Sequence, residues 1–205
     1  SKDQSYFLWQ LNQKQLKHVL FPVGGCAKTE VKKLAKKFKL PILNIPESQE
    51  VCFIRTTVGN FLKEYFKEKP GRIINKNGQV IGKHQGLWLY TIGQRKGIKL
   101  AGGPYWVLNK DIKRNVLIVT KNEKDLYEKE LTAKNVNWIS GKSPRLPLKV
   151  KAQIRYRHKP ASAVISRQKR GEVRVIFSKA QRAITPGQSI VFYIKEELLG
   201  GGIIC

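Results

Sequence analysis

The sequence predicts three successive parts: a short α+β segment, a small strand-rich central domain and a C-terminal antiparallel β-barrel. Three observations lead to this prediction. Amphipathic helical spacing is confined to the first third of the chain, an Asn-Gly hairpin signal follows it, and short strands separated by turn residues fill the chain from about residue 130 onward. We place the domain boundaries at 1–57, 58–128 and 129–205.

Three stretches near the N-terminus have helical spacing. Residues 11–18 predict a short helix, and residues 58–66 predict a longer one. Residues 30–38 predict an amphipathic helix with Thr29 as its N-cap. Its apolar residues recur at i, i+3, i+4 and i+7: Val31, Leu34, Ala35 and Phe38. A short apolar stretch follows this helix, which is typical of the last piece of an α/β layer.

Strand signals dominate the rest of the chain. Asn77-Gly78 separates two short apolar runs, and both residue types tolerate the positive φ of a hairpin turn. Residues 116–119 predict a buried strand. Six short strands follow, and their regular spacing favours a small closed barrel. They are expected at 133–139, 148–157, 161–168, 172–177, 189–194 and 198–204.

The chain is strongly basic. Its 205 residues hold 40 Lys and Arg against 14 Asp and Glu, a formal net charge of +26. Such a charge requires a polyanion or an anionic surface to balance it. Decoration of a solvated surface would add Glu alongside Lys, and Glu is scarce here. Residues 132–182 carry fourteen basic residues and one acid, so the barrel region is predicted to bind nucleic acid.

One predicted barrel strand concentrates this charge. If residues 149–159 alternate, a basic face holds Lys149, Lys151, Gln153, Arg155, Arg157 and Lys159. Phosphates of a nucleic acid would bind such a ridge and supply affinity that falls with salt. Tyr156 lies on the other face. Its ring either stacks on a base or belongs to the core with its hydroxyl at the edge.

Several classes of site are not predicted. The three histidines lack ligand spacing and the three cysteines form no Cys-x-x-Cys pair, so no metal site is expected. Neither glycine-rich stretch continues into a phosphate loop, so no nucleotide site is expected in this chain. No apolar run reaches the length of a membrane span and no signal peptide is visible. We therefore expect reduced thiols, a cytoplasmic location and no membrane partner.

Cys52 stands between Val51 and Phe53, and the residues alone leave its role open. A cysteine in an apolar run is either a small buried hydrophobe or a reactive thiol with a depressed pKa. Nearby lysines favour a thiolate, whereas Glu47 and Glu50 oppose it. The chain begins with Ser1 and contains no Met, so we expect it to be a piece of a longer protein.

Six sequence blocks, in order, resemble one known family, the tRNA-specific 2-thiouridylases, which replace the C2 oxygen of the wobble uridine with sulfur. The resemblance runs from Lys2 to the terminal Gly-Gly-Gly-Ile-Ile. The blocks are Lys2–Leu8 (KDQSYFL), Leu20–Gly24 (LFPVG), Glu47–Ile54 (ESQEVCFI), Gly82–Gly86 (GKHQG), Tyr90–Gly97 (YTIGQRKG) and Thr185–Gln188 (TPGQ).

The resemblance implies that residues 1–57 are the tail of an α/β ATP-pyrophosphatase domain. The family's Ser-Gly-Gly-x-Asp-Ser loop and its Asn-Pro-Asp-x-x-Cys segment do not occur in this sequence. ATP, with Mg²⁺, would therefore be bound by a part of the protein outside this chain. By itself the chain is expected to bind RNA without turnover.

The resemblance also implies residue roles. Cys52 would be the catalytic cysteine that carries the persulfide sulfur, loaded by a sulfur-carrier protein, and it would form a disulfide with a second cysteine outside this sequence. The partner nucleic acid would be tRNA, held at its anticodon region. The implied tRNA-contacting residues are Lys2, Asp3, Gln4, Arg155, Tyr156 and Gln188. Before Cys52, Gln49 and Glu50 replace the Thr and Gly of the family variant Asp-Ser-Thr-Gly-Ile-Cys.

A second hypothesis explains the charge and the barrel equally well. The chain would be a non-catalytic RNA-binding β-barrel module associated with translation, and Cys52 would be structural. The two hypotheses differ in whether Cys52 accepts a persulfide.

Overall fold

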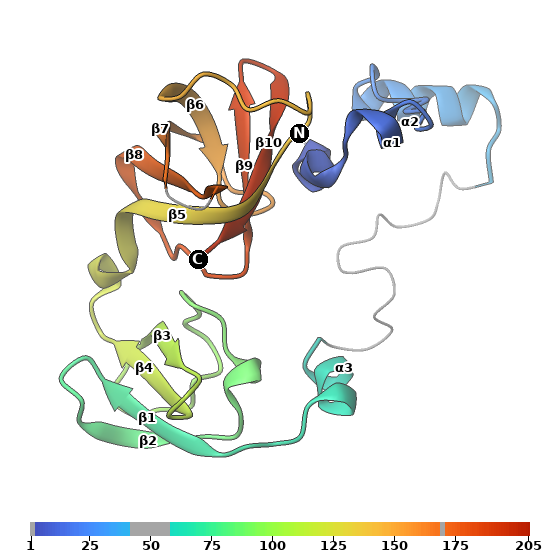
Figure 1. Cartoon of the computed structure of the whole chain (residues 1–205). Coiled ribbons are helices and arrows are strands. Elements are labelled where there is room, and N and C mark those ends of the chain that lie inside the picture. Colours follow the sequence, from blue (N-terminus) through green and yellow to red (C-terminus); the bar gives the residue numbers. More distant parts are fainter. Residues whose placement is uncertain (1–2, 42–57, 169–170) are drawn as a thin grey trace.

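The computed structural model describes residues 3–41, 58–168 and 171–205. Figure 1 shows a β-barrel, a separate smaller sheet and a group of helices near the N-terminus. This is the fold class predicted from the sequence: few helices, a strand-rich central domain and a C-terminal barrel. No helix within these ranges is long and apolar enough to span a membrane.

The barrel closes through six strands in the order β10-β5-β8-β7-β6-β9, and every pairing is antiparallel. Phe192, Ile165 and Val175 are fully or almost fully buried inside it. Closure leaves no free sheet edge, which removes the main aggregation hazard of a β protein. The predicted closed barrel is confirmed. Its strands are β5 (Tyr127–Trp138), β6 (Leu148–Gln153), β7 (Ala161–Arg167), β8 (Val173–Arg182), β9 (Ser189–Ile194) and β10 (Glu197–Ile204).

The predicted strand 148–157 is too long. Strand β6 ends at Gln153, and the next residues form a turn in which Arg157 has a φ of 65°. Gln153 and Ile154 are both buried, so the alternation of the strand stops there. The continuous basic ridge predicted from 149 to 159 is therefore wrong. Lys149 and Lys151 are exposed on the strand, whereas Arg155, Arg157 and Lys159 follow from a turn.

The central domain is a four-stranded sheet in the order β2-β1-β4-β3. Strands β1 and β4 pair in parallel, and the other neighbours are antiparallel. The predicted Asn-Gly hairpin is confirmed, because Gly78 has a φ of 84° and its N–H donates to the Asn75 carbonyl at 3.0 Å. Ile73, Leu117 and Val119 are fully buried. The strands are β1 (Gly71–Asn75), β2 (Val80–His84), β3 (Trp106–Asp111) and β4 (Val116–Thr120), with 3-10 helices η2 (Leu87–Leu89) and η3 (Glu123–Leu126).

The three predicted helices are present as α1 (Gln13–Leu16), α2 (Lys28–Lys37) and α3 (Val58–Tyr65), preceded by the 3-10 helix η1 (Ser5–Gln10). The predicted Thr29 cap is wrong, because helix α2 starts at Lys28, two residues before the predicted start, and Ala27 is the N-cap. The Glu30 carboxylate accepts a hydrogen bond from the Ala27 N–H at 2.6 Å, which satisfies the N–H of the N-cap residue.

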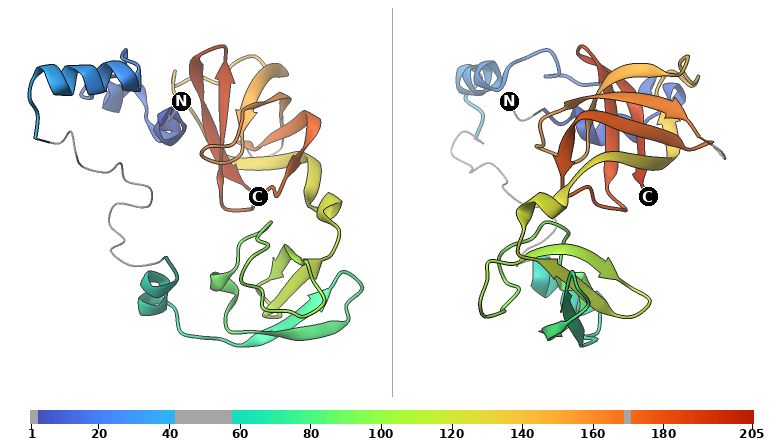
Figure 2. Two further views of the ribbon diagram at one scale, coloured as in Figure 1. Left: turned by 180° about the vertical axis from the view of Figure 1, so that it is seen from behind. Right: turned by 90° about the vertical axis from the view of Figure 1, so that its left-hand side faces the viewer.

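The barrel and the central sheet meet through Arg182, at the end of β8. Its Nε donates to the Glu123 carboxylate at 2.8 Å, and its Nη2 donates to the Gly93 carbonyl at 3.2 Å. Gly93 has a φ of 82°, and a Cβ placed on it would lie only 2.6 Å from the Ala183 Cβ. The two views in Figure 2 show the barrel above the sheet, joined through η3 and the start of β5. A glycine at position 93 therefore permits the close approach.

Candidate nucleic-acid interface

The 3-10 helix η1 covers part of the outer wall of the barrel. Successive residues of a strand point to opposite faces, so Val191 and Tyr193 point outward when Phe192 points into the core. Both outward residues are nevertheless buried, because Tyr6 and Trp9 of η1 pack on them. Four consecutive residues of β9 are buried for this reason.

Glycine and asparagine on the barrel fit η1 closely. A Cβ placed on Gly201 would lie 2.5 Å from the Ile190 carbonyl oxygen and 3.0 Å from two carbons of the Trp9 indole, so a side chain there would displace both the neighbouring strand and the ring. The Asn137 side-chain amide donates to the carbonyls of Trp9 at 2.7 Å and Leu11 at 3.0 Å. These contacts fix the N-terminal segment against β5 and β10.

Two tyrosine hydroxyls anchor the polar edge of this contact. The Tyr6 hydroxyl donates to the Ser189 carbonyl at 2.8 Å, and the Tyr193 hydroxyl lies 3.3 Å from the Ser5 Oγ. The Asp3 carboxylate accepts from the Ser5 N–H at 2.8 Å. Burial raises the pKa of Tyr6 and of Tyr193, so both phenols keep their protons at neutral pH.

An aromatic pair of one exposed ring, Phe7, and one half-buried ring, Tyr156, lies beside this edge. The Phe7 and Tyr156 rings are 4.6 Å apart between centroids, with an interplanar angle of 47°. Phe7 is 58% exposed although it is a large apolar residue. The Arg157 guanidinium carbon lies 5.4 Å from the centroid of the Tyr156 ring, within the range of a cation–π contact. The result is a solvent-facing aromatic surface with a cation at its border.

Arg155 connects the turn after β6 to the segment before β9. Its Nη2 donates to the Ala183 carbonyl at 3.3 Å and to the Thr185 Oγ1 at 3.2 Å. Its Nε and Nη1 make no hydrogen bond with the residues that the structure describes. Gln188, three residues after Thr185, is exposed, and its carbonyl accepts from the Ile204 N–H at 2.8 Å.

Five of the six residues implied as tRNA contacts lie around one surface, which we call the η1–barrel junction. Tyr6 lies between them. Its hydroxyl donates a hydrogen bond to Ser189, the residue after Gln188, its ring lies 6.2 Å from that of Tyr156, and the positive charge of Arg155 acts on its hydroxyl. The sixth, Lys2, and the predicted catalytic residue Cys52 lie outside the described residues. The junction comprises Asp3–Trp9, Arg155–Arg157, Thr185–Ser189 and Tyr193.

Sequence reasoning gave no contact role to several members of the junction, among them Phe7 and Tyr193. Phe7 belongs to an aromatic run that gave no sign of which ring stays exposed. Tyr193 lies in the continuous apolar run of β9, and that continuity was the available signal, because a strand with no polar alternation is covered on both faces.

The described ranges contain no group of three or more His, Cys, Asp or Glu side chains that could hold a metal ion. Cys26 and Cys205 are free and exposed. The predicted disulfide and persulfide chemistry concerns Cys52, which lies outside these ranges.

Three family models match consecutive parts of the chain. Residues 1–56 match a tRNA methyl transferase HUP domain, 59–121 a tRNA methyl transferase PRC-barrel domain, and 128–204 an aminomethyltransferase beta-barrel domain. These descriptions name methyl transfer, whereas the curated relatives that match nearly the whole chain carry another name.

Those relatives are tRNA-specific 2-thiouridylases. The enzyme of Acetivibrio thermocellus is 44% identical over 99% of this chain and that of Thermoanaerobacter sp. is 46% identical over 100%, each match covering 57% of the relative. The enzyme of Coxiella burnetii is 44% identical over 99% of this chain and 59% of the relative. The chain thus spans somewhat more than half the length of these relatives. The resemblance predicted from six blocks is confirmed, and the chain belongs to the tRNA-specific 2-thiouridylase family.

Proposed function

We propose that the gene product containing this chain thiolates C2 of the wobble uridine in tRNA, with Cys52 as the residue that carries the sulfur. The observation that supports this most is the η1–barrel junction, where segments nearly 190 residues apart in the chain bring the implied tRNA contacts to one surface. The relatives' name supports the reaction, and the net charge of +26 supports the polyanionic substrate.

The junction is suited to RNA in two ways. Arg155 keeps the Nε–H and one N–H₂ group free of described partners, and its guanidinium is already oriented by Ala183 and Thr185. A pre-oriented guanidinium loses little entropy when it binds a phosphate. The Phe7–Tyr156 pair offers two apolar rings tilted by 47° to each other, and an unpaired base of an anticodon loop stacks on the open face of such a ring.

The sulfur chemistry starts at Cys52. A sulfur-carrier protein donates a sulfane sulfur and Cys52 becomes a persulfide. ATP supplies the activation that turns the C2 oxygen into a leaving group, and we assign no residue of this chain to ATP. The terminal persulfide sulfur forms the C–S bond at C2 as the activated oxygen leaves. A second cysteine thiolate, outside this sequence, then attacks the Cys52 sulfur. The S–S bond breaks, 2-thiouridine is released and a disulfide remains, which a thiol reductant returns to two thiols.

The first test separates catalysis from RNA binding. We expect Cys52→Ser in the full gene product to abolish thiolation of tRNA, measured by retardation in a mercury-containing gel, while tRNA affinity is unchanged. Cys26→Ser is the matched control, because Cys26 is exposed and free, and it should thiolate as the unmodified protein does. Thiolation by the Cys52→Ser protein would reject the sulfur-carrying role of Cys52. An unmodified gene product that binds tRNA but never thiolates it would favour the non-catalytic RNA-binding module.

The second test addresses the junction. Removing one phosphate contact lowers the slope of log affinity against log salt by about one unit. We expect Arg155→Ala to produce this change with tRNA, and Arg114→Ala in the central domain to leave the slope as it is. Thermal melting of both variants controls for the two hydrogen bonds that Arg155 makes within the barrel. An unchanged slope for Arg155→Ala would remove Arg155 from the phosphate contacts.

A further inference from the structure

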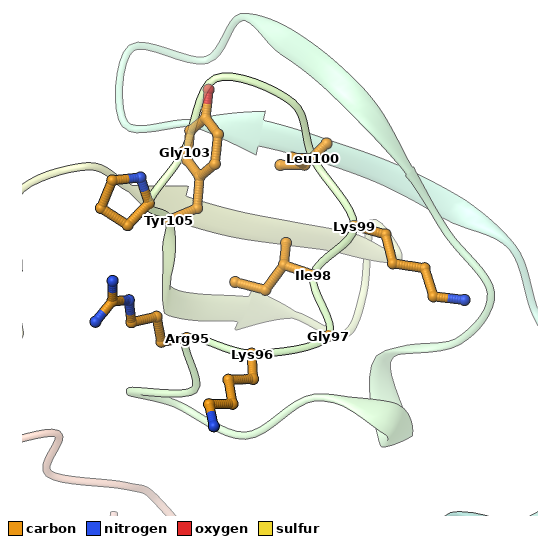
Figure 3. Close-up of a pocket in the computed structure, with 9 residues that line it drawn as sticks. Arg95, Lys96, Gly97, Ile98, Lys99, Leu100, Gly103 and Tyr105 are labelled. Atoms are coloured by element: carbon orange, nitrogen blue, oxygen red, sulfur yellow. The ribbon is translucent and has the colours of Figure 1, made fainter.

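A second basic surface lies in the central domain, on the loop that precedes β3. The loop surrounds an open pocket of about 620 Å³. Its nine lining residues include three cations and no acid: Arg95, Lys96, Gly97, Ile98, Lys99, Leu100, Gly103, Pro104 and Tyr105. In Figure 3 the Arg95 and Lys96 side chains extend from one side of the loop and Lys99 from the other. All three cations are exposed.

The loop has a defined shape. The Gln94 side chain accepts from the Thr91 N–H at 2.9 Å and donates to the Lys96 carbonyl at 2.9 Å, so one amide holds both ends of the first turn. Gly97 has a φ of 80°, a value that glycine adopts without strain. Ile98 is buried in the core of the central domain and anchors the middle of the loop.

Aromatic rings hold two cations of this region in place. The Arg95 guanidinium carbon lies 5.7 Å from the centroid of the Trp106 ring, and the Lys121 Nζ lies 5.2 Å from that of Tyr105. In the described part of the chain, Arg95, Lys96, Lys99 and Lys121 form no ion pair. A cluster of oriented, unneutralised cations attracts an anion more strongly than scattered flexible lysines do.

We propose that this loop, with Lys121, binds backbone phosphates of the same RNA that the η1–barrel junction holds. The inference rests on the proposed function and adds a second RNA-binding site to it. The Arg182 contact to the Gly93 carbonyl, at the start of the loop, ties the loop to the barrel. Two sites held at a fixed separation bind one polyanion more tightly than either does alone, because the second contact is intramolecular.

The test compares two variants of equal charge. Arg95→Gln/Lys96→Gln removes two charges from the loop. Lys113→Gln/Lys129→Gln removes two exposed charges outside both RNA-binding surfaces. Affinity for unfractionated tRNA is measured from 50 to 300 mM salt, and thermal melting confirms folding. We expect the loop variant to bind at least about tenfold more weakly at low salt, with a slope lowered by about 1.5 units, while the control slope changes by less than half a unit.

Each result has one meaning. Loop and control variants with the same slope would overturn the proposal, while a lowered slope for Arg155→Ala in the same assay would keep the proposed function. Failure of the unmodified chain to bind tRNA would overturn both. ATP and inorganic pyrophosphate form a second arm, because a free phosphate could use the same cations. Loop-dependent binding of these small anions, with tRNA binding unaffected by the loop variant, would also overturn the assignment to RNA.

Discussion

The barrel and helix α2 both carry large apolar residues, which are buried in the barrel and exposed on the helix. Inside the barrel Phe192 is completely buried, whereas Phe38 at the end of α2 is 64% exposed and no residue of α2 is buried. A closed sheet encloses its own core and pairs all its strands. A single amphipathic helix has only one apolar stripe and needs another surface to cover it. The apolar stripe of α2 is therefore a feature whose stabilising effect depends on what packs against it, while that of the barrel does not.

The largest expected effect tests this contrast with one substitution at two places. Phe192→Ala should lower the free energy of unfolding by about 3–5 kcal/mol, because it opens a cavity in a closed core. Phe38→Ala, in the same 205-residue chain, should cost less than about 1 kcal/mol. Urea denaturation followed by tryptophan fluorescence measures both. Equal losses would mean that the α2 stripe is covered in solution as fully as the barrel core is.

The next effect concerns the contact between barrel and central sheet. Gly93→Ala should lower the free energy of unfolding by about 1–2 kcal/mol because of the positive φ, and by a further amount because of the clash with Ala183. Gly78→Ala should lower it only by the amount due to the positive φ. Gly78 is the matched control, because its φ is 84° and nothing lies within 4 Å of its added Cβ. Urea denaturation of both variants gives the difference. If the two losses agree, the domains do not approach at Gly93 as described.

The smallest expected effect is a loss of stability in acid that arises from His84 of the central domain. His84 is fully buried, its Nε2 lies 3.3 Å from the Asn115 carbonyl, and its Nδ1 has no partner among the described residues. Burial lowers the pKa of His84 below its usual 6.5, although the bond to Asn115 partly opposes this. The folded state therefore binds the proton less readily than the unfolded state does, and acid favours unfolding.

We expect the stability of the central domain to be constant above pH 6.5 and to fall as the pH drops from 6.5 through the lowered pKa of His84. Thermal melting between pH 5 and pH 8 measures this, with His84→Gln as the comparison, since an amide has no titration in that range. A fall of the same size in the His84→Gln protein would assign the acid sensitivity to other groups.

The sequence was sufficient for features that depend on local pattern. Asn77-Gly78 predicted the hairpin, and six spaced strands predicted the closed barrel. The predicted length of β6 was too long, because the residues after Gln153 still alternate in polarity although the chain has already turned there. Polarity alone does not distinguish a basic strand from a basic turn.

The candidate site required contacts that no local pattern contains. The hydrogen bond from Tyr6 to Ser189 joins residues 183 positions apart, and the packing of Phe7 on Tyr156 joins distant segments in the same way. The resemblance to a family indicated Asp3, Gln4, Arg155, Tyr156 and Gln188 one by one, but not that they share a surface. Whether Cys52 acts there stays a prediction, because it lies outside the described residues.

The seating of Trp9 over Gly201 has a practical consequence for anyone who shortens this protein. The first dozen residues complete the wall of a barrel whose strands all come more than a hundred positions later. A truncated protein that starts at the central sheet would keep every strand but would expose Val191 and Tyr193, which form an apolar patch on the outer surface of the barrel. We expect such a truncated protein to self-associate through this patch. Its weaker binding of RNA would then be mistaken for the loss of RNA-contacting side chains.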